Sequence, residues 1–233
     1  MSDPVSLETP IEASVLYLAE TAEDLMTFRN RPAFTGDVYE LPDGRTVALV
    51  QHPCAMRRGA KLAPKLLVCE TKTLQNAPPD WSTGHFKRMF LPDLAAGGLT
   101  IEFDGLDVVS REDIQNAERR VILAETGVNL LVQRWIHHNS RVVIKTMTIH
   151  DQTTGPFEEA DLVGESLDDL VDAGLNYEQA LGNVDQWLGE PHVVGGVSRR
   201  EMLDNPQTRG AVRSSLRRHV RETSAAATET AKR

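Results

Sequence analysis

The stretch from Thr35 to Thr73 constrains the fold of this chain more than any other part. It contains two runs with strand composition, Val38 to Leu41 and Thr46 to Gln51, joined by Pro42-Asp43-Gly44. An Asp-Gly turn between β-rich runs is a strong local signal for a hairpin. A third apolar run, Lys65 to Cys69, follows closely. Short strands with tight connections predict a small, strongly bent antiparallel sheet, because so few residues can bury a core only by curling.

Composition indicates an ordinary globular protein. Of the 233 residues, 40% are hydrophobic and 25% are charged, and no apolar run reaches membrane-spanning length. The N-terminus lacks the basic-then-apolar pattern of a signal peptide. These features predict a cytoplasmic protein without a membrane partner, in which Cys54 and Cys69 are thiols and not a disulfide.

The net charge of −9 conceals a segregation along the chain. Residues 45–90 hold eight basic side chains and two acidic ones, residues 151–190 hold eleven acidic side chains and no lysine or arginine, and the residues from 191 onward hold nine basic and four acidic side chains. The acidic total therefore does not exclude a polyanionic partner for either basic block. Solvated faces of a globular protein explain the same pattern.

The first 110 residues predict one helix and about six strands. Thr9-Pro10 can start a helix that runs to Phe28, although a strand from Val15 to Leu18 followed by a helix capped by Thr21 fits the same residues. After a polar loop, further strands are expected at Phe86 to Leu91, Leu99 to Phe103 and Leu106 to Val109, the last two joined by a turn at Asp104-Gly105.

The remaining residues predict mainly helices. Ser110 caps a helix that ends at Gly127, a second helix covers residues 129–138, and the β-branched run of residues 141–150 is typical of a strand. Further helices are expected to begin at Ser166, Asn176, Ser198 and Pro206. We therefore predict an α+β chain with an N-terminal helix (1–33), a small β-barrel with helices (34–150), an acidic then basic helical extension (151–222) and a disordered tail (223–233).

Two arrangements of reactive side chains are candidates for chemistry. His52 lies beside Cys54, and a histidine can activate a thiol, but neighbouring residues at a strand end point to opposite sides. His137-His138 and His150-Asp151 do not match zinc-ligand spacings, and no glycine-rich phosphate loop is present. We therefore expect neither a metal nor another cofactor.

A cluster of basic residues offers a binding hypothesis. Strand ends and loops converge at one rim of a small barrel, so basic side chains there could follow a phosphate backbone. Ion pairs with the acidic block would account for the same charges. The residues concerned are Arg45, Arg57, Arg58, Lys61 and Lys65.

This region contains several short motifs in succession: Gly36-Asp37-Val38-Tyr39, the run from Arg45 to Gln51, the run from Pro64 to Cys69, and the threonines Thr71 and Thr73. In this order they resemble successive strands of the MazF/PemK family of toxin ribonucleases. The resemblance covers about residues 34–126. In this chain Thr46 replaces the proline that the family pattern places after the arginine, and the loop before Arg45 is a tight turn.

The resemblance implies an SH3-like barrel, usually a homodimer, that cleaves single-stranded RNA without a metal. Its expected catalytic pair falls on Arg45 and on Thr71 or Thr73. Such a pair suits attack of a 2′-hydroxyl on the adjacent phosphate, which needs proton transfer and stabilisation of negative charge.

Two functions follow as hypotheses. The first is an RNA-binding protein or endoribonuclease of the toxin or defence type, with the acidic block folded over the basic rim. The second is a non-catalytic module with a MazF-like barrel that docks a protein partner, as an accessory to phage defence or a product of a mobile element.

Overall fold

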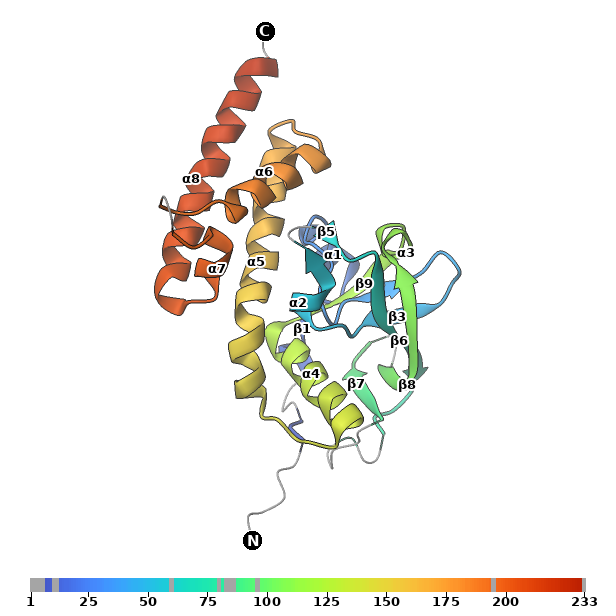
Figure 1. Ribbon diagram of the computed structural model, residues 1–233. Helices are drawn as coiled ribbons and strands as arrows, with labels where there is room; N and C mark the ends of the chain where they lie inside the picture. The colour runs from blue at the N-terminus through green and yellow to red at the C-terminus, as the bar shows by residue number, and fades with distance from the viewer. Residues whose placement is uncertain are drawn as a thin grey trace. The chain divides into compact units, whose positions relative to one another are not determined.

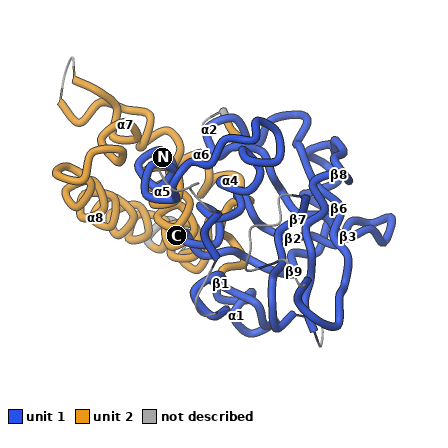
Figure 2. The backbone as a smooth tube through the Cα atoms, turned by 90° about the horizontal axis from the view of Figure 1, so that it is seen from below, with its two compact units in different colours: residues 1–27, 34–56, 62–153 blue, residues 28–33, 57–61, 154–233 orange. Residues whose placement is uncertain are grey.

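The computed structural model describes residues 7–9, 13–58, 61–78, 81, 87–94, 97–193 and 196–231 (Figure 1). The chain is a mixed α+β protein built on an antiparallel sheet, which confirms the predicted class. It divides into two compact units (Figure 2). Unit 1 covers residues 1–27, 34–56 and 62–153, and unit 2 covers residues 28–33, 57–61 and 154–233.

Unit 1 contains a seven-stranded sheet in the order β1-β9-β2-β3-β6-β8-β7, with every neighbouring pair antiparallel. The strands are β1 (Tyr17–Ala19), β2 (Val38–Glu40), β3 (Thr46–Leu49), β6 (Lys65–Leu74), β7 (Arg88–Pro92), β8 (Gly98–Ser110) and β9 (Glu118–Leu123). A separate ladder joins β4 (Arg57–Arg58) to β5 (Lys61–Leu62).

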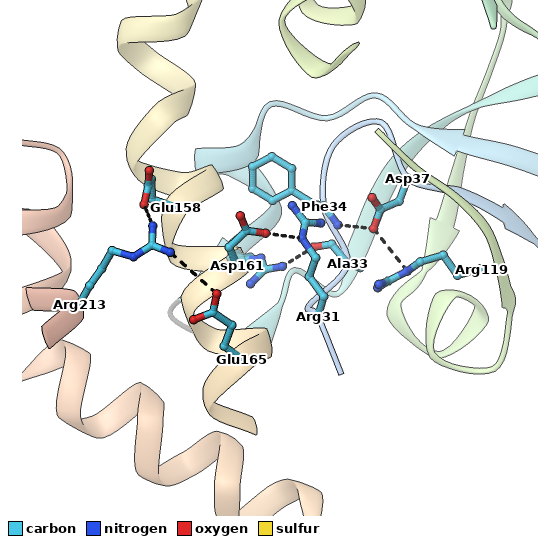
Figure 3. A network of polar contacts seen from close by, with 10 residues as sticks. Arg31, Ala33, Phe34, Asp37, Arg119, Glu158, Asp161, Glu165 and Arg213 are labelled. Carbon is cyan, nitrogen blue, oxygen red and sulfur yellow. Dashed lines mark hydrogen bonds and ion pairs between the residues drawn. The ribbon is translucent and has the colours of Figure 1, made fainter. Parts of the chain in front are cut away.

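The β2–β3 hairpin confirms the prediction from the Asp-Gly turn. Gly44 has a φ of +85°, a conformation that glycine adopts without steric cost. The preceding Gly36 also has a positive φ, and a Cβ there would lie 2.7 Å from a Leu123 side-chain atom. Asp37 then accepts a hydrogen bond from the backbone of Phe34 and an ion pair from Arg119 (Figure 3). The Gly-Asp motif therefore anchors the hairpin in the core of unit 1.

Strands β6 and β8 are long, and the register between them shifts along their length. The register runs from Lys65 opposite Ser110 to Cys69 opposite Leu106, and then jumps so that Thr71 lies opposite Ile101. The predicted turn at Asp104-Gly105 is wrong, because these residues form an irregularity inside one strand and do not end it. This irregularity bends the strand.

The two outer strands of the sheet, β1 and β7, are linked by a side chain. The hydroxyl of Tyr17 in β1 donates a 2.6 Å hydrogen bond to the carbonyl of Pro92 at the end of β7. Among the described residues no backbone ladder joins these strands. The sheet is thus an open one whose two edges approach each other at this point.

The predicted single N-terminal helix is wrong. Residues 17–19 instead pair with β9, because a strand there completes the sheet edge. A 3₁₀ turn, η1 (Ala13–Leu16), precedes this strand, and a short helix, α1 (Ala22–Thr27), follows it. Thr21 accepts a hydrogen bond from the amide of Asp24, as the alternative interpretation predicted.

The predicted helix between Ser110 and Gly127 is also wrong beyond its first turn. Ser110 caps α3 (Arg111–Gln115) as expected, but residues 118–123 form β9 between β1 and β2. Sheet pairing here overrides the helical spacing of the apolar residues. Gly127 does not terminate a helix: it lies within α4 (Glu125–Ser140), where a Cβ would come within 2.4 Å of the Leu16 carbonyl oxygen.

The predicted strand over residues 141–150 is wrong as well. Helix α5 (Thr146–Asp172) begins inside this run, and the Glu8 carboxylate accepts hydrogen bonds from the amide and hydroxyl of Thr146. A carboxylate at a helix N-terminus is stabilising, and Glu8 is remote in sequence from the helix it caps. Ser166, predicted to cap a helix, lies inside α5 and donates to the Leu162 carbonyl.

Unit 2 is mainly helical. It contains residues 154–172 of α5, then α6 (Tyr177–Gly189), α7 (Arg199–Leu203) and α8 (Pro206–Ala231), with helix starts at Asn176 and Ser198 as predicted, each closed by a capping box. Buried side chains of all four helices form its core, including Leu167, Val184, Leu203 and Leu216. The predicted disordered tail is wrong up to Ala231, where the helix-favouring composition continues α8.

Candidate functional site

Arg45, the residue that the family resemblance assigns to catalysis, is held by two carboxylates. It follows the hairpin turn, and its amide and Nε donate to Asp43 at 2.9 and 2.8 Å. Its Nη1 donates to Asp107 of β8 at 2.8 Å. The Arg45 side chain is 42% exposed, so this ion-paired group, which we call the Arg45 clamp (Asp43, Arg45, Asp107), lies at the surface.

The electrostatics of the Arg45 clamp disfavour proton transfer. Hydrogen bonds from Arg45 lower the pKa of Asp43 and of Asp107, and the same bonds raise the pKa of Arg45. A general base or acid works best with a pKa near the working pH, and these shifts move all three groups away from neutrality. The pKa of Asp113 is lowered chiefly by hydrogen bonds from the amide and hydroxyl of Ser110, with a smaller lowering by Arg45 and an opposing effect of Asp43.

The structure brings Thr71 beside Thr46, the residue that follows Arg45. The β3–β6 register pairs Val47 with Glu70, and the Thr71 hydroxyl donates to the Thr46 carbonyl at 3.1 Å. Thr73 lies two residues further along β6, opposite Leu99, and is exposed. Thr46, not Arg45, therefore lies opposite Thr71, and because neighbouring residues of a strand point to opposite faces, the ladder does not pair the Arg45 and Thr71 side chains. The Thr71 hydroxyl proton is also engaged by the backbone.

The predicted basic cluster divides between the two units. Unit 1 holds Arg45 and Lys65, and Lys65 at the start of β6 lies about 20 Å along the strand from Thr71. Unit 2 holds Arg57, Arg58 and Lys61. Arg57 donates to the backbone carbonyl of Ala33, Lys61 is exposed, and the Arg58 side chain lies outside the described part of the structure.

The acidic block finds its partners within unit 2. Arg213 of α8 contacts Glu158 and Glu165, and Arg31 contacts Asp161 at 3.1 Å (Figure 3). Arg200 bridges Glu159 and Asp185 at 2.8 and 2.6 Å. These ion pairs compensate carboxylates of α5 and α6 with the C-terminal basic block and with the segment of residues 28–33.

The backbone makes a contact within the His52–Cys54 arrangement. The Cys54 amide donates to His52 Nδ1 at 3.3 Å, and burial lowers the pKa of His52. Cys54 is exposed in the one-turn helix α2 (Pro53–Met56), whereas Cys69 is buried and its pKa is raised to about 12. Among the described residues no group of three or more metal-ligating side chains is present.

Sequence reasoning missed the part played by β8. Asp107 is a partner of Arg45 that only the tertiary structure supplies, whereas Asp43 could have been suggested by its place in the Asp-Gly turn. On either side of Asp107, Leu106 and Val108 are 47% and 51% exposed. Two large apolar side chains beside a carboxylate on one exposed strand are an uncommon surface feature and a candidate contact site.

Comparison with known proteins adds no assignment. No protein-family model matches this chain, and no curated protein is significantly similar to it. No helix in the described ranges is both long enough and apolar enough to cross a bilayer.

Proposed function

We propose that this chain is a non-catalytic protein-interaction module and that unit 1 supplies its contact surface. The observation that supports this most directly is the Arg45 clamp. Because Asp43 and Asp107 both bind Arg45, the three side chains carry a net negative charge, and the guanidinium is not available to an RNA phosphate without displacing them. Strand β8, which carries Asp107, also exposes Leu106 and Val108, and apolar side chains suit a protein partner better than a polyanion.

A MazF/PemK-like, SH3-like barrel is the architecture we propose for unit 1. The bent strands β6 and β8 and the Tyr17–Pro92 hydrogen bond between the outer strands support this proposal, since both curl the sheet toward closure. A scaffold can be retained while its chemistry is lost, because fold does not confer function. The free thiols of Cys54 and Cys69 suit action in the reducing cytoplasm.

A second candidate, binding or cleavage of single-stranded RNA by a toxin or defence protein, is favoured by one observation. Thr71 bonds to Thr46, so its backbone lies across the β3–β6 ladder from the residue that follows Arg45. To bind the Arg45 guanidinium, an RNA phosphate would have to displace Asp43 and Asp107 from it. Exposed ion pairs are weak and screened by salt, so a phosphate could compete for the guanidinium.

An RNA assay separates the two candidates. Purified full-length chain is incubated with fluorescent single-stranded RNA, and cleavage is measured for wild type, Arg45→Ala and Arg120→Ala. Arg120 is the matched control, because it is also an exposed arginine that contacts two carboxylates, Glu40 and Glu118. We expect no cleavage that depends on Arg45. Cleavage by wild type and Arg120→Ala that is lost only in Arg45→Ala would overturn the proposed function. Growth of cells in which the chain is induced is a second readout, and we expect no growth arrest that depends on Arg45.

Crosslinking identifies the class of partner. A photoreactive amino acid is placed at position 108 or, as a control, at position 26, where Met26 is 63% exposed in α1. We expect adducts from position 108 that resist nuclease and are destroyed by protease. Nuclease-sensitive adducts would instead support the RNA candidate. Adducts with a second copy of the chain would indicate the homodimer implied by the family resemblance, which light scattering can test independently.

A further inference from the structure

Within the part of the chain that the structure describes, residues 106–110 of β8 form an edge of the sheet that pairs on one side only. On one side they pair with β6, from Cys69 opposite Leu106 to Lys65 opposite Ser110. On the other side the described residues of β7 pair only with residues 98–102 of β8. The second half of β8 therefore has one side without a neighbouring strand among the described residues. We call residues 106–110 the β8 edge.

The β8 edge presents alternating chemistry. Leu106 and Val108 are two residues apart, so their exposed side chains point to the same face of the sheet. Asp107 between them points to the other face, where it binds Arg45. Asp43 and Asp113 are the other carboxylates of this surface.

Carboxylates occupy the two amides of this edge. The Val108 amide donates to Asp107 Oδ1 at 2.7 Å, and the Ser110 amide donates to Asp113 Oδ2 at 2.9 Å. Amides two residues apart in a strand point to the same side, so both belong to the side away from β6. Charged side chains at an unpaired edge block unspecific strand pairing. A partner strand must therefore displace both carboxylates.

We infer that the β8 edge accepts an extended segment of a partner protein that alternates apolar and basic residues. This inference rests on the proposed function and specifies the chemistry of the partner. Lysine or arginine side chains of the segment would attract Asp107 and Asp113 and release the two amides for backbone pairing. Its apolar side chains would cover Leu106 and Val108, as in other complexes formed by strand addition.

Charge complementarity decides between occupants of this edge. Asp107 and Asp113 accept the hydrogen bonds of the Val108 and Ser110 amides, so an acidic strand or a nucleic acid would bring negative charge against these carboxylates and be repelled. A purely apolar strand would bury carboxylates without pairing them, which is costly. A segment with basic residues at alternate positions meets both requirements.

Binding of designed peptides to the full-length chain tests the inference. The probe is a short fluorescein-labelled peptide that alternates valine and lysine, and its affinity is measured by fluorescence anisotropy. Two control peptides carry glutamate in place of lysine or N-methyl groups on alternate amides. We expect both controls to bind at least about tenfold more weakly, and binding of the lysine peptide to weaken with added salt. Equal binding of either control, or no binding of the lysine peptide, would overturn the inference.

Variants locate the binding site. Val108→Asp and Asp107→Asn should each weaken binding of the lysine peptide about tenfold, whereas Met26→Asp, which adds the same charge at another exposed apolar site of unit 1, should leave it unchanged. Amide exchange should slow at Val108 and Ser110 in the peptide complex. Equal loss in all three variants, or unchanged exchange at both amides, would place the peptide elsewhere and refute the β8 edge as its site.

The peptide experiments and the RNA assay can fail independently of each other. Arg45-dependent RNA cleavage would remove the proposed function whatever the peptides do. Failure of the lysine peptide, together with protein adducts at position 108 and no RNA cleavage, would retain the interaction module and remove only the basic-strand partner.

Discussion

The Tyr17 hydroxyl donates a 2.6 Å hydrogen bond to the Pro92 carbonyl and so connects the two outer strands of the unit 1 sheet. The partners are 75 residues apart in sequence. Burial raises the pKa of Tyr17, with Glu20 and Asp93 acting in the same direction, so the hydroxyl keeps its proton and remains a donor. The Tyr17 side chain thus joins the two outer strands, which a backbone ladder would join in a closed barrel.

Tyr17→Phe tests the contribution of this bond. Removing the hydroxyl leaves the Pro92 carbonyl without its partner, which should lower the free energy of unfolding by about 1–2 kcal/mol. Tyr177→Phe is the control, since Tyr177 is exposed and water can replace what its hydroxyl loses. Urea unfolding measures both variants. Equal effects would show that the Tyr17–Pro92 bond adds little to stability.

Gly36 and Gly44 should differ in their tolerance of alanine. Both have positive φ, +90° and +85°, but a Cβ at Gly36 would overlap Leu123 whereas a Cβ at Gly44 has open space. Gly44→Ala should cost about 1 kcal/mol from backbone strain alone, and Gly36→Ala about 2 kcal/mol or more. Chemical denaturation provides the comparison. A larger loss for Gly44→Ala would contradict the packing described around Gly36.

The Arg45 clamp predicts an acidic titration of Asp107. Its pKa is lowered from 3.8, chiefly by the hydrogen bond from Arg45. A carboxyl whose folded pKa is depressed contributes stability above its unfolded pKa and loses that contribution as the pH falls through the folded value. Carbon NMR of the Asp107 carboxyl should give a midpoint below 3.8 in wild type and a higher one in Arg45→Gln. An unchanged midpoint would show that Arg45 does not hold Asp107 in solution.

His219 should resist protonation in unit 2. Its ring stacks on Trp187 at 5.7 Å and contacts Asn183 at 2.9 Å, and burial lowers its pKa from 6.5. The charge of Arg199, whose guanidinium lies over the Trp187 ring, also lowers the pKa of His219, whereas the charges of Glu222 and Glu190 raise it. The folded state therefore favours neutral histidine, and this contribution to stability is lost as the pH falls below about 6.5.

Proton NMR of the His219 ring measures this effect. The midpoint should lie below 6.5 in the folded chain. Thermal unfolding between pH 7 and 5 should show a smaller loss of stability in His219→Asn than in wild type. A midpoint at or above 6.5 would contradict the burial of this ring.

Local signals in the sequence predicted the elements whose stability is local. The Asp43-Gly44 turn and the helix starts at Asn176 and Ser198 appear as predicted. Each depends on contacts within a few residues or on a regular helical spacing. For the candidate site, the same reasoning identified Arg45 and Thr71, but the structure places Thr46, not Arg45, opposite Thr71.

Tertiary contacts decided the rest. Residues 17–19 and 118–123 became strands because each completes the sheet for the other, and residues after Thr146 became helix with Glu8 at its N-terminus. The sequence by itself determined the α+β class, the hairpin and the helix caps. Only the tertiary structure paired Arg45 with Asp107 and left the β8 edge open, because such contacts join residues whose separation along the chain carries no local signal.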